Sequence, residues 1–404
     1  MKNVLKNSNW KGKLLCLALM AATVAGIFCL KFEADNDYRL VNTATLTYVR
    51  AEVLSIEREN LQVDSLEPDR MVGTQTITVR LLDGQNAGCE VSLTNYLTRA
   101  LNISVSIGQT IIVCADEPEN AAPYYTVYSY YRSPMLLLVV LIFAAIATTV
   151  GRARGLWSML GLAYTIFVIL FFLVRAIFYG AEPLLVAVAA VGATSLFALW
   201  LLADLTPKMW NALAGTLLGV SLSGILFALF AAMLHISGYN LDSAESLLLI
   251  GQSTGMQIRP LLLVAVLVTA LGAVMDVAVS IASALDEIHR IDPDLSGAEL
   301  FRSGLNIGRD MVGTMTNTLI LAYTGAALTT MLLLMGYGYS MTYLLNSDYL
   351  AMELAQGVAS TAGVILTVPI TALICSVTYG HRRGGMEPAR CRTRSARVRR
   401  SLRG

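Results

Sequence analysis

Asp276 is the residue whose type and position could do chemistry most readily, because it lies inside a long apolar segment. Sixteen uncharged residues precede it from Pro260, and nine uncharged residues follow it. A carboxylate in the hydrocarbon of a membrane is costly, so it normally faces protein or water and has a partner. An acidic residue in this position could bind a proton or a cation.

Two consecutive apolar segments each carry a polar stripe. Residues three, four and seven apart share a helix face. On the first segment the stripe comprises Thr269, Ala273, Asp276, Ser280, Ser283 and Glu287. On the second it comprises Asn306, Asp310, Thr314, Asn317 and Thr324, with Arg309 and Thr316 on its flank. We predict a polar pathway of Asp276, Ser280, Ser283, Thr314, Asn317 and Thr324, with Arg309 and Asp310 at its cytoplasmic mouth.

Asp276 is expected roughly 24 Å below the outer surface at 1.5 Å per residue, within the inner third of a core about 30 Å thick. At this depth it could hydrogen-bond Asn317 or Thr316, or pair with Arg309. Serine and threonine also bond across membrane helices as simple packing contacts, and we favour that interpretation for them. For Asp276 we favour a functional role, because an ionisable group is costly as a packing contact. Glu287, Asp292, Asp294 and Glu299 are predicted to lie in a solvated loop.

The composition indicates an integral membrane protein. Of the 404 residues, 55% are hydrophobic and only 14% charged, and the net charge of +1 implies no bulk electrostatic partner such as nucleic acid. A span needs about 20 mostly apolar residues. We predict eight spans, at Leu14–Leu30, Met135–Val150, Trp157–Phe178, Leu184–Leu202, Ala212–Leu234, Leu261–Ser283, Val312–Met335 and Val358–Val377.

Basic residues orient these spans in a cell membrane, because Lys and Arg gather in cytoplasmic loops. Lysines precede the first span, alternate loops carry the basic residues, and nine arginines lie in the last 24 residues. Both termini are therefore predicted to be cytoplasmic. The arginine-rich tail, residues 381–404, is expected to contact anionic lipid. The first span, within residues 1–30, is interpreted as an uncleaved anchor rather than a signal peptide.

Residues 31–133 change to a period of two. Five strands are predicted, at Thr47–Glu57, Thr74–Leu82, Cys89–Asn95, Gln109–Ala115 and Tyr124–Arg132, with glycine turns at Gly84, Gly88 and Gly108. They suggest a small antiparallel barrel of OB or SH3-like size, extracytoplasmic by topology. Its last tyrosines, Tyr124, Tyr125, Tyr128, Tyr130 and Tyr131, are interpreted as an interfacial belt. Residues 134–380 form a seven-helix membrane domain.

Other motifs are sparse. Gly215, Gly219 and Ser223 follow at four-residue intervals and predict close helix packing. Cys89 and Cys114 share the polar region, and a disulfide between them is left open, with free thiols favoured. The three histidines are far apart, and no P-loop, HExxH or GxSxG motif occurs, so no metal, cofactor or hydrolase is expected.

Three segments resemble the YibE/F family of bacterial membrane proteins. They are GAVMDVAVSIASALDEI (Gly272–Ile288), SGLNIGRDMVGTMTNTLILAYTGAAL (Ser303–Leu328) and GRARGLWSMLGLAYTIFVI (Gly151–Ile169). The resemblance covers Gly151 to about Thr371 and implies a multi-pass bacterial membrane protein. It supplies no substrate and no site residue.

Three functions fit these observations. The first is a secondary transporter or permease component for a small solute or ion, with Asp276 taking a proton or cation. The second is a non-catalytic scaffold or sensor whose β-domain binds a ligand. The third, and least favoured, is an intramembrane aspartyl protease using Asp276 and Asp310, which would have to share a proton. A homo-oligomer is compatible with each of the three.

Overall fold

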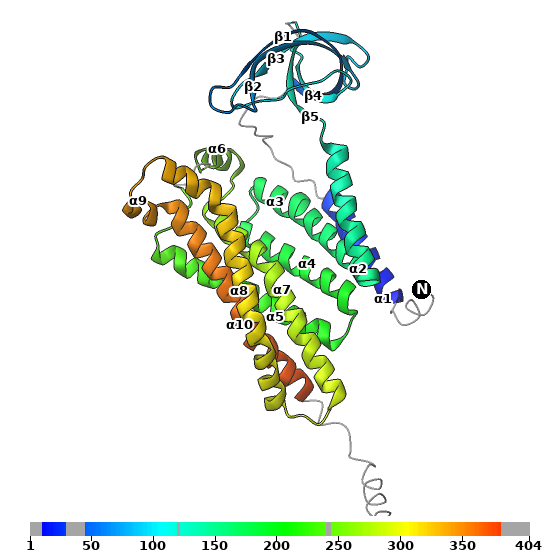
Figure 1. Cartoon of the computed structure of the whole chain (residues 1–404). Coiled ribbons are helices and arrows are strands. Elements are labelled where there is room, and N and C mark those ends of the chain that lie inside the picture. Colours follow the sequence, from blue (N-terminus) through cyan, green and yellow to red (C-terminus); the bar gives the residue numbers. More distant parts are fainter. Residues whose placement is uncertain (1–9, 30–44, 119–121, 240–243, 381–404) are drawn as a thin grey trace, which may run out of the picture. The chain divides into compact units, whose positions relative to one another are not determined.

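The computed structural model describes residues 10–29, 45–118, 122–239 and 244–380 (Figure 1). The chain divides into two compact units, Tyr38–Arg152 and a second that combines Met1–Asp37 with Ala153–Gly404. The first half of helix α2 therefore groups with the strands, whereas the sequence places the boundary near residue 133. The arginine-rich tail, 381–404, lies outside the described residues.

The first unit contains a curved five-stranded antiparallel sheet (Figure 1). Its strands are β1 (Leu46–Val63), β2 (Met71–Leu81), β3 (Glu90–Leu97), β4 (Thr110–Asp116) and β5 (Tyr124–Tyr130). All five predicted strands are confirmed. The hydrogen-bonded order is β3-β2-β1-β4-β5, with β3 and β5 at the two edges, so the sheet forms an open half-barrel instead of the expected barrel.

The long strand β1 bends the sheet. Its first part pairs with β4 and its later part pairs with β2, and the register shifts between Val53 and Ser55 and between Ile56 and Arg58. Such bulges increase twist and bend a strand. Alternate residues point inward, so Val53, Ile77, Val79, Ile111 and Val113 are fully buried in one small core. Gly84 and Gly108 adopt φ of 90° and 81°, which confirms the predicted glycine turns.

The tyrosines of β5 do not form a single belt, because the period-two strand divides them between its faces. Tyr125 is buried in the sheet core, and its hydroxyl donates to Glu117 Oε1 at 3.1 Å. Tyr130 donates to the backbone oxygen of Ser104 at 2.9 Å. Only Tyr124 and Tyr128 are strongly exposed among them. Cys89 and Cys114 are free thiols.

Seven helices are long and apolar enough to cross a membrane within the described chain. They are α1 (Trp10–Cys29), the stretch Ser133–Phe178, α4 (Pro183–Ala203), α5 (Pro207–Met233), α7 (Arg259–Ile291), α8 (Gly297–Gly336) and α10 (Asp348–Gly380). The short helices α6 (Ala244–Thr254) and α9 (Met341–Leu345) complete the set and were not expected.

The difference from the expected eight spans lies in one place. The stretch Ser133–Phe178 combines α2 (Ser133–Phe167), the π-helical η2 (Val168–Leu173) and α3 (Val174–Phe178). Arg152 interrupts it with φ 51° and ψ −134°, which is not helical. At 1.5 Å per residue the 46 residues would extend about 69 Å, more than twice a core of about 30 Å. The stretch is thus long enough for two crossings.

Small residues hold α5 against α10. A Cβ added at Gly215 would meet Thr371, one at Gly219 would meet Thr367, and one at Gly363 would meet Ser223. This confirms the close packing predicted from the four-residue spacing. Pro369 lies inside α10, which continues through it. Together α4, α5, α7 and α10 form the centre of the helical core.

Candidate functional site

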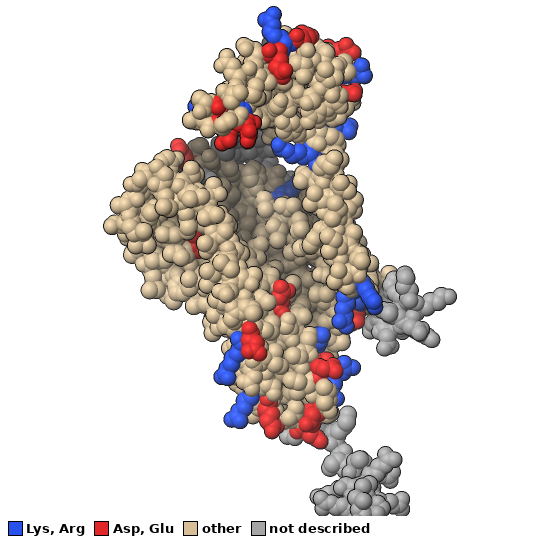
Figure 2. Space-filling model, viewed as in Figure 1, with Lys and Arg blue, Asp and Glu red and all other residues tan. Residues whose placement is uncertain are grey.

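Helix α7 holds Asp276 on its one exposed stripe. The apolar side chains of α7, including Val274, Val277 and Ile281, are buried in the helical core. Asp276 and Ser280 lie on the side turned away from them and are exposed in the isolated chain. Figure 2 shows that charged side chains are scarce across the middle of the helical body and gather at its lower end, where α7 ends and α8 begins.

Asp276 opens onto a cavity of about 320 Å³. The cavity lies among α7, α4, η2 and the part of α2 after the break. Four hydroxyl side chains line it together with the carboxylate: Ser158, Thr165, Thr194 and Ser195. The remaining walls are apolar and include Trp157, Leu162, Leu202 and Leu271. A carboxylate and several hydroxyls thus share one small space bounded by hydrocarbon side chains.

The hydroxyls leave oxygen lone pairs free. Thr165 donates to the backbone oxygen of Gly161 at 3.0 Å, Thr194 to that of Ala190 at 2.7 Å, and Ser195 to that of Val191 at 2.6 Å. A hydroxyl that donates its hydrogen bond to a backbone oxygen of its own helix can still accept hydrogen bonds through its own oxygen. The Asp276 carboxylate forms no hydrogen bond or ion pair with any described residue. The cavity is consequently rich in oxygen acceptors, which suit a proton donor or a hard cation.

The expected bonds from Asp276 to Asn317, Thr316 or Arg309 are not present among the hydrogen bonds and ion pairs of the described residues. Asn317 is exposed and unbonded, and Arg309 Nη1 donates to Asn306 Oδ1 at 3.4 Å. Thr316 is partly buried, with its hydroxyl oxygen unbonded. Asp310 is exposed.

The orientation of α8 explains why Asn317 does not reach Asp276. Gly304 and Gly308 face α10, where an added Cβ would meet Ala372 and Val368. Asn317 follows Gly308 by nine residues, which at 3.6 residues per turn turns it to the opposite side of α8. Gly304 lies against Leu285, and nine residues further along these antiparallel helices are Gly313 and Asp276, which therefore lie at about the same level. The level of Asn317 agrees within about one turn, but its face differs.

The other predicted pathway residues are bonded locally or exposed. Ser283 donates to Val279 at 2.6 Å, Thr314 to Met311 at 3.0 Å, and Thr324 to Ile320 at 2.8 Å, each to a backbone oxygen of its own helix. Ser280 is exposed without a side-chain bond in the described part. The structure thus brings Asp276 together with hydroxyls of α2 and α4, and not with those of α8.

Glu287 and Glu299 are helical, although a loop was expected there. Helix α7 continues to Ile291, and Glu287 lies 3.5 Å from Arg290 in an exposed ion pair. Glu299 forms a capping box with Ser296 at the start of α8, which satisfies the first backbone N–H groups of that helix. Both acidic residues are therefore helix-end features.

A second polar cluster was not predicted. Tyr379 of α10 is buried, and its hydroxyl donates to Asp286 Oδ1 of α7 at 3.0 Å. The His289 ring stacks on Tyr379 with centroids 4.9 Å apart. Beside them, Thr378 donates to Asn211 Oδ1 of α5 at 2.9 Å. The sequence did not predict this cluster because the predicted span stopped at Ser283. Helix α7 continues to Ile291, and this continuation places Asp286 and His289 on one helix face.

The long apolar helices and the small half-barrel fit an integral membrane protein with one separate β-sheet unit. A family model described as YibE/F-like protein matches residues 139–381, more than half of the chain. The chain therefore belongs to the YibE/F family. No curated protein and no solved structure matches it.

Proposed function

We propose that the protein is a secondary transporter or permease component in which Asp276 binds a proton or a small cation. The observation that carries this proposal is the position of Asp276, which opens onto a hydroxyl-lined cavity and has no partner among the described residues. An unpaired carboxylate between membrane helices is costly and marks ion pathways and proton relays. Binding a proton or a cation would remove that cost.

The size of the cavity supports a small solute. About 320 Å³ corresponds to roughly ten water molecules at about 30 Å³ each. Such a space holds a partly hydrated ion or a small polar molecule, and its hydroxyl oxygens can replace part of a hydration shell. We propose no enzymatic step at this cavity. Asp310 shares no hydrogen bond with Asp276, so an aspartyl dyad has no support.

The topology that fits this function has eight crossings in a cell membrane, with the break at Arg152 between two of them. Both termini are then cytoplasmic and the β-sheet unit is extracytoplasmic, as the basic residues of the loops favour. The first helix is retained as an anchor in this proposal. Cys16 and Met20 of α1 are buried in the helical core, and Thr23 Oγ1 lies 3.0 Å from the Tyr164 hydroxyl, which supports a helix that stays in place.

Carbodiimide labelling tests whether Asp276 takes a proton or cation. Dicyclohexylcarbodiimide adds to protonated carboxyl groups in apolar surroundings, and peptide mass spectrometry locates the adduct. We expect labelling of Asp276 that falls as pH rises and that one of Na⁺, K⁺ or Mg²⁺ suppresses. Glu287, an exposed carboxylate on the same helix, is the internal control and should stay unlabelled. Labelling of Glu287 with none at Asp276 would refute the proposal.

The β-sheet unit favours a second candidate function, a sensor or scaffold that binds a ligand outside the helices. The exposed rings of Tyr48 and Tyr128 lie 4.7 Å apart on the outer face of the sheet, which is a surface that partners commonly use. Deleting residues 33–132 separates the candidates. A scaffold should lose its function, whereas a transporter whose helices fold should keep its flux.

A further inference from the structure

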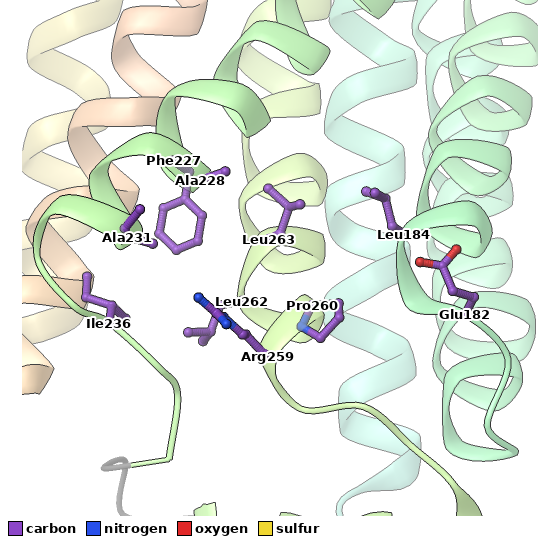
Figure 3. Close-up of a pocket in the computed structure, with 11 residues that line it drawn as sticks. Glu182, Leu184, Phe227, Ala228, Ala231, Ile236, Arg259, Pro260, Leu262 and Leu263 are labelled. Carbon is purple, nitrogen blue, oxygen red and sulfur yellow. The ribbon is translucent and has the colours of Figure 1, made fainter.

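A pocket of about 250 Å³ lies where α5 ends and α7 begins (Figure 3). Its walls are mostly apolar and include Phe227 and Ala231 of α5, Ile236 after it, and Leu262 and Leu263 of α7. This pocket does not overlap the Asp276 cavity, since no residue lines both. It is therefore a separate candidate site, and its apolar walls suit a ligand with an apolar part.

Arg259 brings a positive charge to this apolar pocket. Figure 3 shows its side chain extending along the pocket toward Ala231 and Ile236, away from Glu182 at the other end. The guanidinium forms no hydrogen bond or ion pair within the described chain. Glu182 is already engaged as the N-cap of α4, where its Oε2 accepts from the Leu185 N–H at 3.3 Å. Arg259 is thus available to an anion.

A second hollow adjoins the same arginine. It measures about 460 Å³. Its lining includes Arg259 and Pro260, Leu248 and Gln252 of α6, and Met256 just after α6. Arg259 consequently stands between two cavities, one apolar and one with amide groups. A ligand anchored there can place an acyl chain in the first cavity and polar headgroup atoms in the second.

We propose that Arg259 and the two cavities bind a phospholipid, with the guanidinium on its phosphate and an acyl chain in the pocket beside Phe227. A guanidinium matches the oxygens of a phosphate with two parallel N–H donors. The apolar walls of the pocket then pack against the acyl chain of the lipid. A free phosphate lacks the acyl chain and would leave the pocket unfilled, so the site distinguishes a lipid from a simple anion.

Native mass spectrometry of the detergent-solubilised full chain tests this proposal, with phosphatidylglycerol as the titrant. We expect Arg259→Gln to weaken phosphatidylglycerol binding by about tenfold, the loss expected for one charged contact. Arg302→Gln, which changes an exposed arginine of α8, serves as the matched control and should leave binding unchanged. Equal binding by wild type and Arg259→Gln would overturn the assignment.

A second variant tests the acyl part and guards against misfolding of the first. Ala228 lines the pocket and is exposed, so Ala228→Trp should fill the space without disturbing the core. We expect this variant to bind phosphatidylglycerol several-fold more weakly, and inorganic phosphate at the same concentration not to displace the lipid from wild type. Displacement by phosphate alone, or unchanged binding by Ala228→Trp, would show that no acyl chain occupies the pocket.

Discussion

The substitution Gly219→Ala should loosen the packing of α5 against its two neighbours. The Cβ it adds would lie 2.7 Å from Cγ1 of Val274 on α7 and would overlap Thr367 on α10. Ordinary contacts of this kind begin near 3.4 Å, so the neighbours must move apart. Thr367 cannot simply rotate away, because it is fully buried and its hydroxyl donates to the Gly363 backbone oxygen at 2.7 Å.

The expected magnitude combines two costs and one gain. Overpacking a well-filled core costs about 1–3 kcal/mol, and a strained or lost Thr367 hydrogen bond adds about 1 kcal/mol. Alanine regains about 1 kcal/mol over glycine through helix propensity. The net loss in the free energy of unfolding is therefore about 1–3 kcal/mol. At about 2–4 °C for each kcal/mol in a domain of this size, the melting temperature should fall by roughly 2–12 °C.

Intrinsic tryptophan fluorescence during heating of the detergent-solubilised protein measures this change. The matched control is Gly192→Ala on α4, where an added Cβ meets nothing within 4 Å, so stability should stay equal or rise. Combining Gly219→Ala with Thr367→Ala should recover part of the loss. A melting temperature for Gly219→Ala at or above that of Gly192→Ala would refute the argument that glycine is needed for the contact.

Two further predictions concern polar contacts in the two units. Tyr379→Phe removes the hydroxyl that donates to Asp286 at 3.0 Å and should cost about 0.6–2 kcal/mol in thermal unfolding, whereas Tyr349→Phe on the same helix should cost nothing measurable. In the sheet unit, the Leu66 N–H and two arginine partners hold the pKa of the buried Asp64 below its usual range. Because the pKa of Asp64 is lower in the folded state than in the unfolded state, this stabilisation is present above pH about 4 and is lost as pH falls through the folded-state pKa. The protection of the strand amides against hydrogen exchange, relative to their intrinsic exchange rate at each pH, should therefore fall at low pH in wild type and should already be lower at pH 7 in Asp64→Asn. Equal protection of the two at pH 7 would contradict this prediction.

Periodicity was sufficient to predict the five strands and the long apolar helices, but not the short helices α6 and α9. Alternation of buried and more exposed residues, as at Ile111, Val113 and Ala115 of β4, predicts the strands, and the apolar segments predict the long helices. Closure of the sheet was not predictable, because it depends on whether β3 and β5 reach each other across the bend in β1. The break at Arg152 was equally hidden, since an unusual φ at one residue leaves hydropathy on both sides unchanged.

The candidate site was predicted in part. Asp276 stands out in the sequence because a charge interrupts an apolar run. Its neighbours do not follow, because several faces of α8 carry polar residues and only packing decides which one turns inward. Gly304 and Gly308 fix that choice by allowing α10 to approach closely. The hydroxyls at Thr165 and Thr194 come from helices whose sequences show no polar stripe, so only the fold brings them to Asp276.

Profiling of small metabolites and ions in cells tests most directly whether Asp276 carries a transport function. Cells lacking the protein are compared with cells rescued by wild type, by Asp276→Asn and by Glu287→Gln at matched expression. We predict that wild type and Glu287→Gln restore the same solute or ion levels and that Asp276→Asn fails to restore them. Full restoration by Asp276→Asn would contradict the account.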